Sequence, residues 1–138
     1  MTRDIMDFIE YIHNEKQTSK NTEVSYERDL RKMNEYLAGQ NVCGVSAVTE
    51  TNLNAYVMFL EHEGRKPATV SRSIASMKAF FHFLERERRI EADPAWRLKA
   101  PKIEKTMPRI LTTEEVTLLL EQPSGNTPKE LRDKAMLE

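Results

Sequence analysis

Apolar residues recur at three- and four-residue steps along most of this chain, which is the period of an α-helix with one buried face. The longest such stretch runs from Gly64 to Ile90, and its apolar stripe is made by Val70, Ile74, Met77, Phe81 and Leu84. Pro67 stands where a first-turn proline fits, because the N–H that it lacks would have no partner inside the helix. We predict a long helix here, and the rest of the chain is organised around it.

Three shorter stretches show the same period. The first covers roughly residues 3–15, the second follows a cap at Ser19 or Asn21 and runs to about Leu37, and the third runs from a cap at Thr49 to near Gly64. Their apolar stripes are Ile5, Phe8, Ile9 and Ile12; Tyr26, Leu30, Met33 and Leu37; and Leu53, Tyr56, Val57 and Leu60. Since each stripe must be buried against another, the pattern predicts an all-α, four-helix bundle.

The helical period stops at Asp93-Pro94 and returns near residue 112. Residues 96–111 contain two prolines and several bases, which predicts a basic linker, either a disordered tether or a segment laid along a phosphate backbone. Residues 112–138 begin with a capping box at Thr112–Glu115, and a second helix starts at Thr127-Pro128. We expect a domain over residues 1–95, the linker over 96–111, and one or two helices of an incomplete second domain over 112–138.

Composition narrows the class of protein. The chain has 138 residues, 39% hydrophobic and 31% charged, with four glycines, which favours a helix-rich globule. No apolar run is long enough to cross a bilayer, and the first residues lack a signal-peptide core. The lone Cys43 excludes an internal disulfide and fits a reducing compartment. We expect a cytoplasmic protein with no membrane partner.

Charge is unevenly distributed along the chain. The formal net charge is −1, but residues 64–105 carry eleven bases and five acids, whereas residues 1–63 carry six bases and eleven acids. The positive charge therefore concentrates on the long helix and the segment after it. A basic region of this size is suited to phosphates, although it does not by itself prove a nucleic-acid partner.

Two helix flanks combine short hydroxyl side chains with arginine. One flank of the long helix has Thr69, Arg72, Ser76 and Ala79, and the second helix has Asn21, Thr22, Ser25 and Arg28. Short donors and arginine can bond phosphate oxygens and base edges where a backbone approaches DNA. We interpret both rows as DNA-facing, with an ordinary solvated helix edge as the alternative.

Four short motifs occur in order along nearly the whole chain. They are Ser19-Lys20-Asn21-Thr22 with Tyr26 and Asp29-Leu30; Pro67 to Arg72 with Phe80 to Leu84; Asp93-Pro94-Ala95, Pro101-Lys102 and Pro108 to Val116; and Leu131 to Glu138. Together they resemble the tyrosine site-specific recombinases of the phage-integrase family, most closely its XerC/XerD-like members.

The resemblance implies a SAM-like core-binding domain that forms half of a clamp around double-stranded DNA, in a protein that assembles as a tetramer with other recombinase subunits. Its second and fourth helices approach the major groove, and linker bases follow the DNA backbone. The DNA-binding candidates are Asn21, Thr22, Ser25, Arg28, Lys66, Thr69, Arg72, Ser73, Ser76, Lys99, Lys102 and Lys105. Asp93 stands where the family often has asparagine, and this small difference puts little of the resemblance in doubt.

No catalytic residue can be assigned. The catalytic arginines, lysine, histidine and tyrosine of the family would lie beyond Glu138, so we predict no strand cleavage by this sequence, although the parent protein would be a recombinase. The three histidines show no metal spacing, and the four tyrosines lie on predicted bundle helices, where packing is the better interpretation. There is no phosphate loop, dinucleotide-binding glycine motif or zinc motif, so no metal or small-molecule cofactor is expected.

Two other functions stay open. The chain could be a helical protein-interaction module that mediates self-association with little DNA affinity, with Phe80 and Phe83 as partner anchors; the alternative for these rings is a wide core face. An intact enzyme with unusual catalytic residues is a third, weaker hypothesis.

Overall fold

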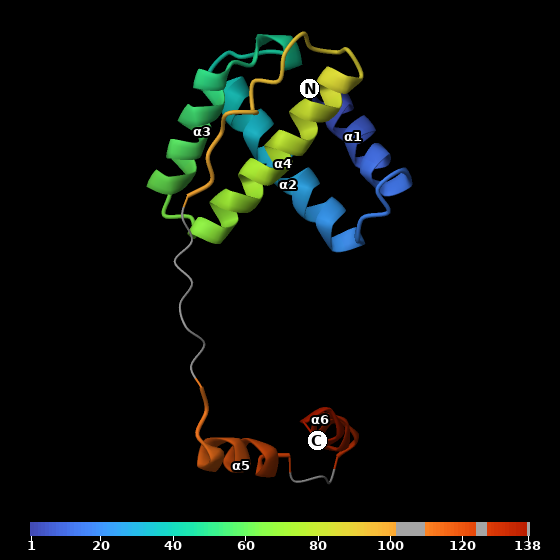
Figure 1. Cartoon of the computed structure of the whole chain (residues 1–138), viewed down its shortest axis with the longest axis vertical. Helices are drawn as coiled ribbons and strands as arrows, with labels where there is room; N and C mark the ends of the chain where they lie inside the picture. The colour runs from blue at the N-terminus through green and yellow to red at the C-terminus, as the bar shows by residue number, and fades with distance from the viewer. Residues whose placement is uncertain (102–109, 124–126, 138) are drawn as a thin grey trace. The chain divides into compact units, whose positions relative to one another are not determined.

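The computed structural model describes residues 1–101, 110–123 and 127–137. Every regular element in these residues is a helix, which confirms the all-α prediction (Figure 1). None of the described helices combines the length and hydropathy that a membrane span requires. The helices are α1 (Thr2–Asn14), α2 (Lys20–Gly39), the short 3₁₀ turn η1 (Val45–Ala47), α3 (Glu50–His62), α4 (Pro67–Arg86), α5 (Thr113–Glu121) and α6 (Pro128–Leu137).

The predicted helix starts are confirmed by their caps. The Ser19 side chain accepts a hydrogen bond from the Thr22 N–H at the start of α2, and Thr49 forms a capping box with Asn52 at the start of α3. Pro67 occupies the first turn of α4. These bonds satisfy backbone donors that have no partner inside the helix, so the local sequence fixes where each helix begins.

The long helix α4 contacts all three other helices of the bundle, as α2 also does. In Figure 1 it crosses α2, with α1 on one side and α3 on the other. Its buried face is wider than one narrow stripe and comprises nine residues: Val70, Ser73, Ile74, Ser76, Met77, Phe80, Phe81, Phe83 and Leu84.

The phenylalanines of α4 belong to this core. Phe80 is fully buried and Phe83 is 5% exposed. Phe8 of α1 contacts both rings, with centroid distances of 5.6 Å to each. The hypothesis that Phe80 and Phe83 are anchors for another protein is therefore wrong, because α1 already covers them.

The chain after α4 folds back onto the bundle. Arg88 adopts a left-handed conformation with φ of 54°, which reverses the chain direction after the helix. Ala95 and Leu98 are then buried among the core residues, with exposed fractions of 0% and 3%. In the described part of the predicted linker, Leu98 is therefore anchored in the core by burial of its side chain, whereas Trp96, Arg97 and Lys99 stay exposed.

The chain divides into two compact units, Met1–Ile103 and Glu104–Glu138. In the second unit, both predicted caps are present, with Thr112 paired to Glu115 and Thr127 paired to Glu130. Neither α5 nor α6 has a buried residue. The assignment of this unit to an incomplete second domain stays a prediction.

Candidate nucleic-acid interface

An ion pair joins the two helices that carry the predicted DNA-facing rows. Arg72 of α4 donates from Nε to Asp29 Oδ2 at 2.9 Å and from Nη2 to Asp29 Oδ1 at 3.1 Å. The Asp29 side chain is 4% exposed and that of Arg72 is 43% exposed. The hydrogen bonds to Asp29 raise the pKa of Arg72 above its usual value. The carboxylate is thus held inside the bundle, while the far side of the guanidinium faces solvent.

This pairing leaves part of the arginine free to bind a ligand. A guanidinium has five N–H donors in a fixed fork, and Asp29 takes one from Nε and one from Nη2. Both N–H groups of Nη1 and one of Nη2 stay available. The buried carboxylate fixes the plane of this free edge, which suits bidentate binding to a phosphate or a base edge.

The ion pair also brings the two rows next to each other. Ser25 lies four residues before Asp29 on α2, and Thr69 lies three residues before Arg72 on α4, so each shares a helix face with its partner in the pair. Both side chains are half-buried at the surface. The ion pair therefore joins the flank of α2 that carries Ser25 to the flank of α4 that carries Thr69 and Arg72, and that these flanks face DNA stays a prediction.

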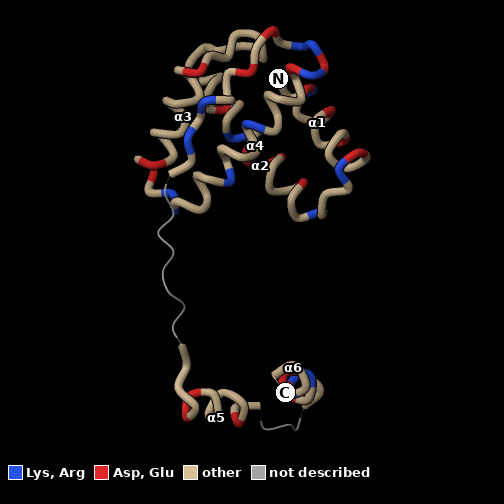
Figure 2. Tube along the Cα trace, viewed as in Figure 1, with Lys and Arg blue, Asp and Glu red and all other residues tan. Residues whose placement is uncertain are grey.

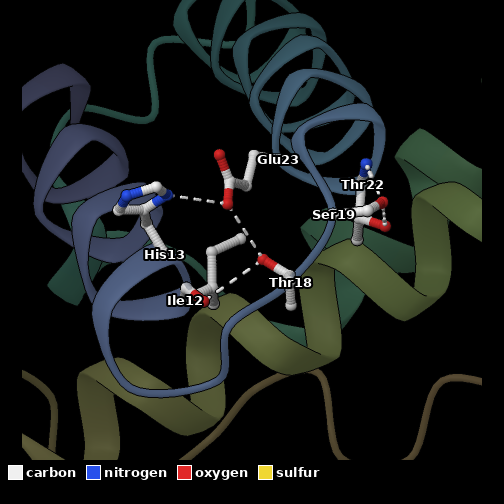
Figure 3. Close-up of polar contacts among 6 residues, drawn as sticks. All are labelled: Ile12, His13, Thr18, Ser19, Thr22 and Glu23. Atoms are coloured by element: carbon white, nitrogen blue, oxygen red, sulfur yellow. Dashed lines mark hydrogen bonds and ion pairs between the residues drawn. The ribbon is translucent and has the colours of Figure 1, made fainter.

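The N-terminal end of α2 is held in place by polar contacts with the end of α1 (Figure 3). Glu23 Oε1 lies 3.0 Å from His13 Nδ1 and 3.3 Å from the Thr18 hydroxyl, which is also 3.2 Å from the Ile12 carbonyl oxygen. The same turn carries the Ser19 cap, whose hydroxyl lies 2.9 Å from that of Thr22. These contacts order the segment that presents Asn21, which is exposed.

Three of the predicted cations are exposed and unpaired in the part of the chain that the structure describes. Arg28 lies on α2, Lys66 precedes the first turn of α4, and Lys99 follows the buried Leu98. Their charges are therefore free to meet phosphates. The other two predicted lysines, Lys102 and Lys105, lie outside the described residues.

Other bases of the positively charged region face the protein itself. Arg89 donates to Asp4 at 3.1 Å and to Asp7 at 2.7 Å, and Arg86 donates to the Tyr11 hydroxyl at 2.7 Å. Figure 2 shows basic and acidic positions interleaved in the loop after α4. Since acids of α1 neutralise Arg89, the excess charge counted from the sequence overstates the charge available to a ligand.

Two of the predicted DNA contacts are wrong. Ser73 is 3% exposed and Ser76 is 0% exposed, so neither can reach DNA from its place in the bundle. The Ser76 hydroxyl donates to the Ser73 carbonyl oxygen at 2.8 Å, which satisfies it without an external ligand. Their small volume lets neighbouring helices approach α4 closely, and this gives them a packing role.

The sequence interpretation missed Asp29 as part of this surface. Asp29 stands directly before Leu30 in the apolar stripe of α2, and an acid on a buried face needs a partner. The place of Asp29 on the apolar face of α2 could have indicated the ion pair, since a carboxylate among core residues predicts a nearby arginine. The identity of the arginine could not be read from α2 alone.

The tyrosines are placed as packing residues, as predicted. Tyr56 is 1% exposed, and burial, with the nearby charge of Asp29, raises its pKa well above the usual value. Tyr11, Tyr26 and Tyr36 are half-buried against the core. A raised pKa disfavours the phenolate, so Tyr56 lacks the activation that a nucleophile needs.

The described residues form a small α-helical bundle in which the Asp29–Arg72 ion pair joins α2 to α4. The family model described as "Phage integrase, N-terminal SAM-like domain" matches residues 5–88, which spans α1 to α4 and the start of the loop after α4. The chain therefore belongs to the phage integrase family through its N-terminal SAM-like domain.

Curated relatives agree with this assignment. A protein of Caldanaerobacter subterraneus is 41% identical over 132 residues, covering 96% of this chain and 45% of that protein. The tyrosine recombinase XerC of Roseiflexus castenholzii is 34% identical over 139 residues, covering 100% of this chain and 44% of the relative. The tyrosine recombinase XerD of Listeria innocua is 33% identical over 135 residues, covering 97% and 46%. This chain thus spans somewhat less than half the length of these relatives.

Proposed function

We propose that this chain is the DNA-binding N-terminal part of a site-specific tyrosine recombinase, and that α2 and α4 bind duplex DNA at the recombination site. The observation that carries the proposal is the buried Asp29, which presents the free edge of Arg72 at the surface where α2 meets α4. The family assignment and the names of the relatives support the same conclusion.

The surface divides into residues that position the protein and residues that read the sequence. Arg28 and Lys66 are long exposed cations suited to phosphates. Ser25, Thr69 and Arg72 lie around the ion pair, where short donors and an oriented guanidinium suit base edges. Asn21 and Thr22, at the ordered start of α2, extend this surface, and Lys99, Lys102 and Lys105 would continue it along the backbone.

The experiment is duplex binding by fluorescence anisotropy over a series of salt concentrations. Arg28→Ala and Lys66→Ala should each weaken binding to any sequence and reduce the slope of log K against log salt by about 1. Arg3→Ala is the matched control, because Arg3 is also exposed and unpaired in the described structure but lies on α1. Equal losses for Arg3→Ala and Arg28→Ala would refute the proposed face.

DNA cleavage is assigned to the part of the longer relatives that this chain does not cover. The tyrosines of this chain are packed against the core, and Tyr11, whose hydroxyl accepts a hydrogen bond from Arg86 at 2.7 Å, lies on α1 and not on α2 or α4. We expect no covalent protein–DNA adduct after incubation with nicked duplex and denaturing electrophoresis. An adduct that disappears with any one Tyr→Phe change would contradict this.

Contacts with further recombinase subunits form the second part of the proposal, as expected for a tetramer on DNA. The support is the family assignment together with the recombinase relatives. Sedimentation velocity of the chain, alone and with duplex, tests it. A chain that stays monomeric both alone and on duplex DNA would count against this part of the proposal.

A further inference from the structure

Three side chains with metal-binding atoms meet at the C-terminal end of α4. His82 and Glu85 lie in its last turns, and Asp93 lies in the loop that folds back after the helix. One nitrogen or oxygen atom from each lies within 4.8 Å of the others. They line a surface hollow together with Ala92 and Trp96. Sequence spacing alone did not suggest this group, because Asp93 joins it only through the turn at Arg88.

Asp93 is already oriented toward the other two residues. The Ala95 N–H donates to Asp93 Oδ1 at 2.7 Å, which fixes the carboxylate and leaves Oδ2 free. Metal-binding carboxylates are usually held by such outer hydrogen bonds. The side chain is half-buried, whereas those of His82 and Glu85 are 72% and 43% exposed and can rotate.

The charges at this point favour a cation. In the described residues no arginine or lysine forms an ion pair with either carboxylate, and the nearest partner is His82 Nδ1, 4.0 Å from Glu85 Oε2. The C-terminal carbonyl groups of α4 add negative potential.

We propose that His82, Glu85 and Asp93 bind one Zn²⁺ ion. One imidazole and two carboxylates form a ligand set that Zn²⁺ accepts, and their two negative charges balance the ion. Mg²⁺ and Ca²⁺ prefer oxygen-only sites. Tetrahedral zinc with bonds of about 2.1 Å places its ligand atoms about 3.4 Å apart, so rotation of the two exposed side chains closes the site.

The bound ion would connect α4 to the loop that follows it. His82 and Glu85 belong to the central helix, and Asp93 lies two residues before the buried Ala95. Zinc would therefore fasten the returning segment to the bundle and stabilise the folded chain, because it binds the folded arrangement and not the unfolded one.

The experiment uses Trp96, the sole tryptophan in the chain, as a reporter in the hollow. Zinc chloride is titrated into the full chain carrying Cys43→Ser, which removes the exposed thiol as a competing ligand. We expect a saturable change in Trp96 fluorescence with one ion per chain, and an increase in melting temperature. Magnesium chloride at the same concentrations should produce neither change.

His82→Ala and Asp93→Asn test the ligands. Each should weaken zinc binding by at least the roughly 10- to 100-fold loss known for outer-shell partners. His62→Ala is the matched control, since His62 is likewise an exposed histidine near the C-terminal end of its helix. Unchanged affinity in His82→Ala, an equal loss in His62→Ala, or an equal response to magnesium would overturn the proposal. Circular dichroism before the titration confirms that each variant is folded.

Discussion

Substitutions in the Asp29–Arg72 pair should have unequal effects on stability. Arg72→Ala leaves a carboxylate that is 4% exposed without its partner, and breaking a buried pair in this way costs about 3–5 kcal/mol. Asp29→Ala leaves a guanidinium that is 43% exposed and can be hydrated. Its loss is limited to two charge-assisted hydrogen bonds that are screened by solvent, about 1–2 kcal/mol.

The double variant gives a sharper test of the same reasoning. Removing both partners leaves no buried charge, so Asp29→Ala/Arg72→Ala should be more stable than Arg72→Ala alone. Arg31→Ala is the matched control on the same helix. Arg31 donates to Glu27 at 2.6 and 2.9 Å, but these side chains are 52% and 30% exposed, so its loss should cost about 0.5 kcal/mol or less.

The assay is urea unfolding followed by circular dichroism at neutral pH, with the free energy of unfolding taken from linear extrapolation. Arg72→Ala should show the lowest midpoint of the four variants. If Asp29→Ala is as destabilised as Arg72→Ala, or if the double variant shows the sum of the two single losses, the unpaired buried carboxylate is not the dominant cost.

Four further predictions rest on burial and capping. Phe80→Ala should destabilise the bundle by about 3–5 kcal/mol in urea unfolding without changing the sedimentation coefficient of the folded chain, since its ring is fully buried. Leu98→Ala should cost about 2–4 kcal/mol, whereas Trp96→Ala, at a site 64% exposed, should cost far less; equal losses would contradict the packing of this segment. Ser19→Ala should lower the free energy of unfolding by about 1 kcal/mol through loss of the α2 cap. Ser76→Ala should leave the salt dependence of DNA binding unchanged, because the Ser76 hydroxyl is buried.

Much of the fold could be predicted from the sequence because its signals are local. The caps at Ser19, Thr49 and Thr112 and the proline at Pro67 act on the backbone within one turn, so the helix starts followed directly from the residues. The apolar stripes likewise identified one buried face for each bundle helix.

The candidate interface was predictable only in part. The sequence placed Ser25 and Thr69 on flanks of α2 and α4, and the structure brings those flanks together at one surface. It could not show that Ser73 and Ser76 lie inside, because helical period describes one helix at a time. How far burial extends around α4 depends on the three helices packed against it.

The amino-acid sequence by itself determined that this protein is a helical bundle with hydroxyl and arginine rows on two of its helices. Only the tertiary structure decided which of those residues are exposed, that Asp29 holds Arg72, and that Asp93 returns to His82 and Glu85. The physical reason is that helix formation depends on interactions within a few residues. The pairing of charges 43 residues apart depends instead on how the helices cross.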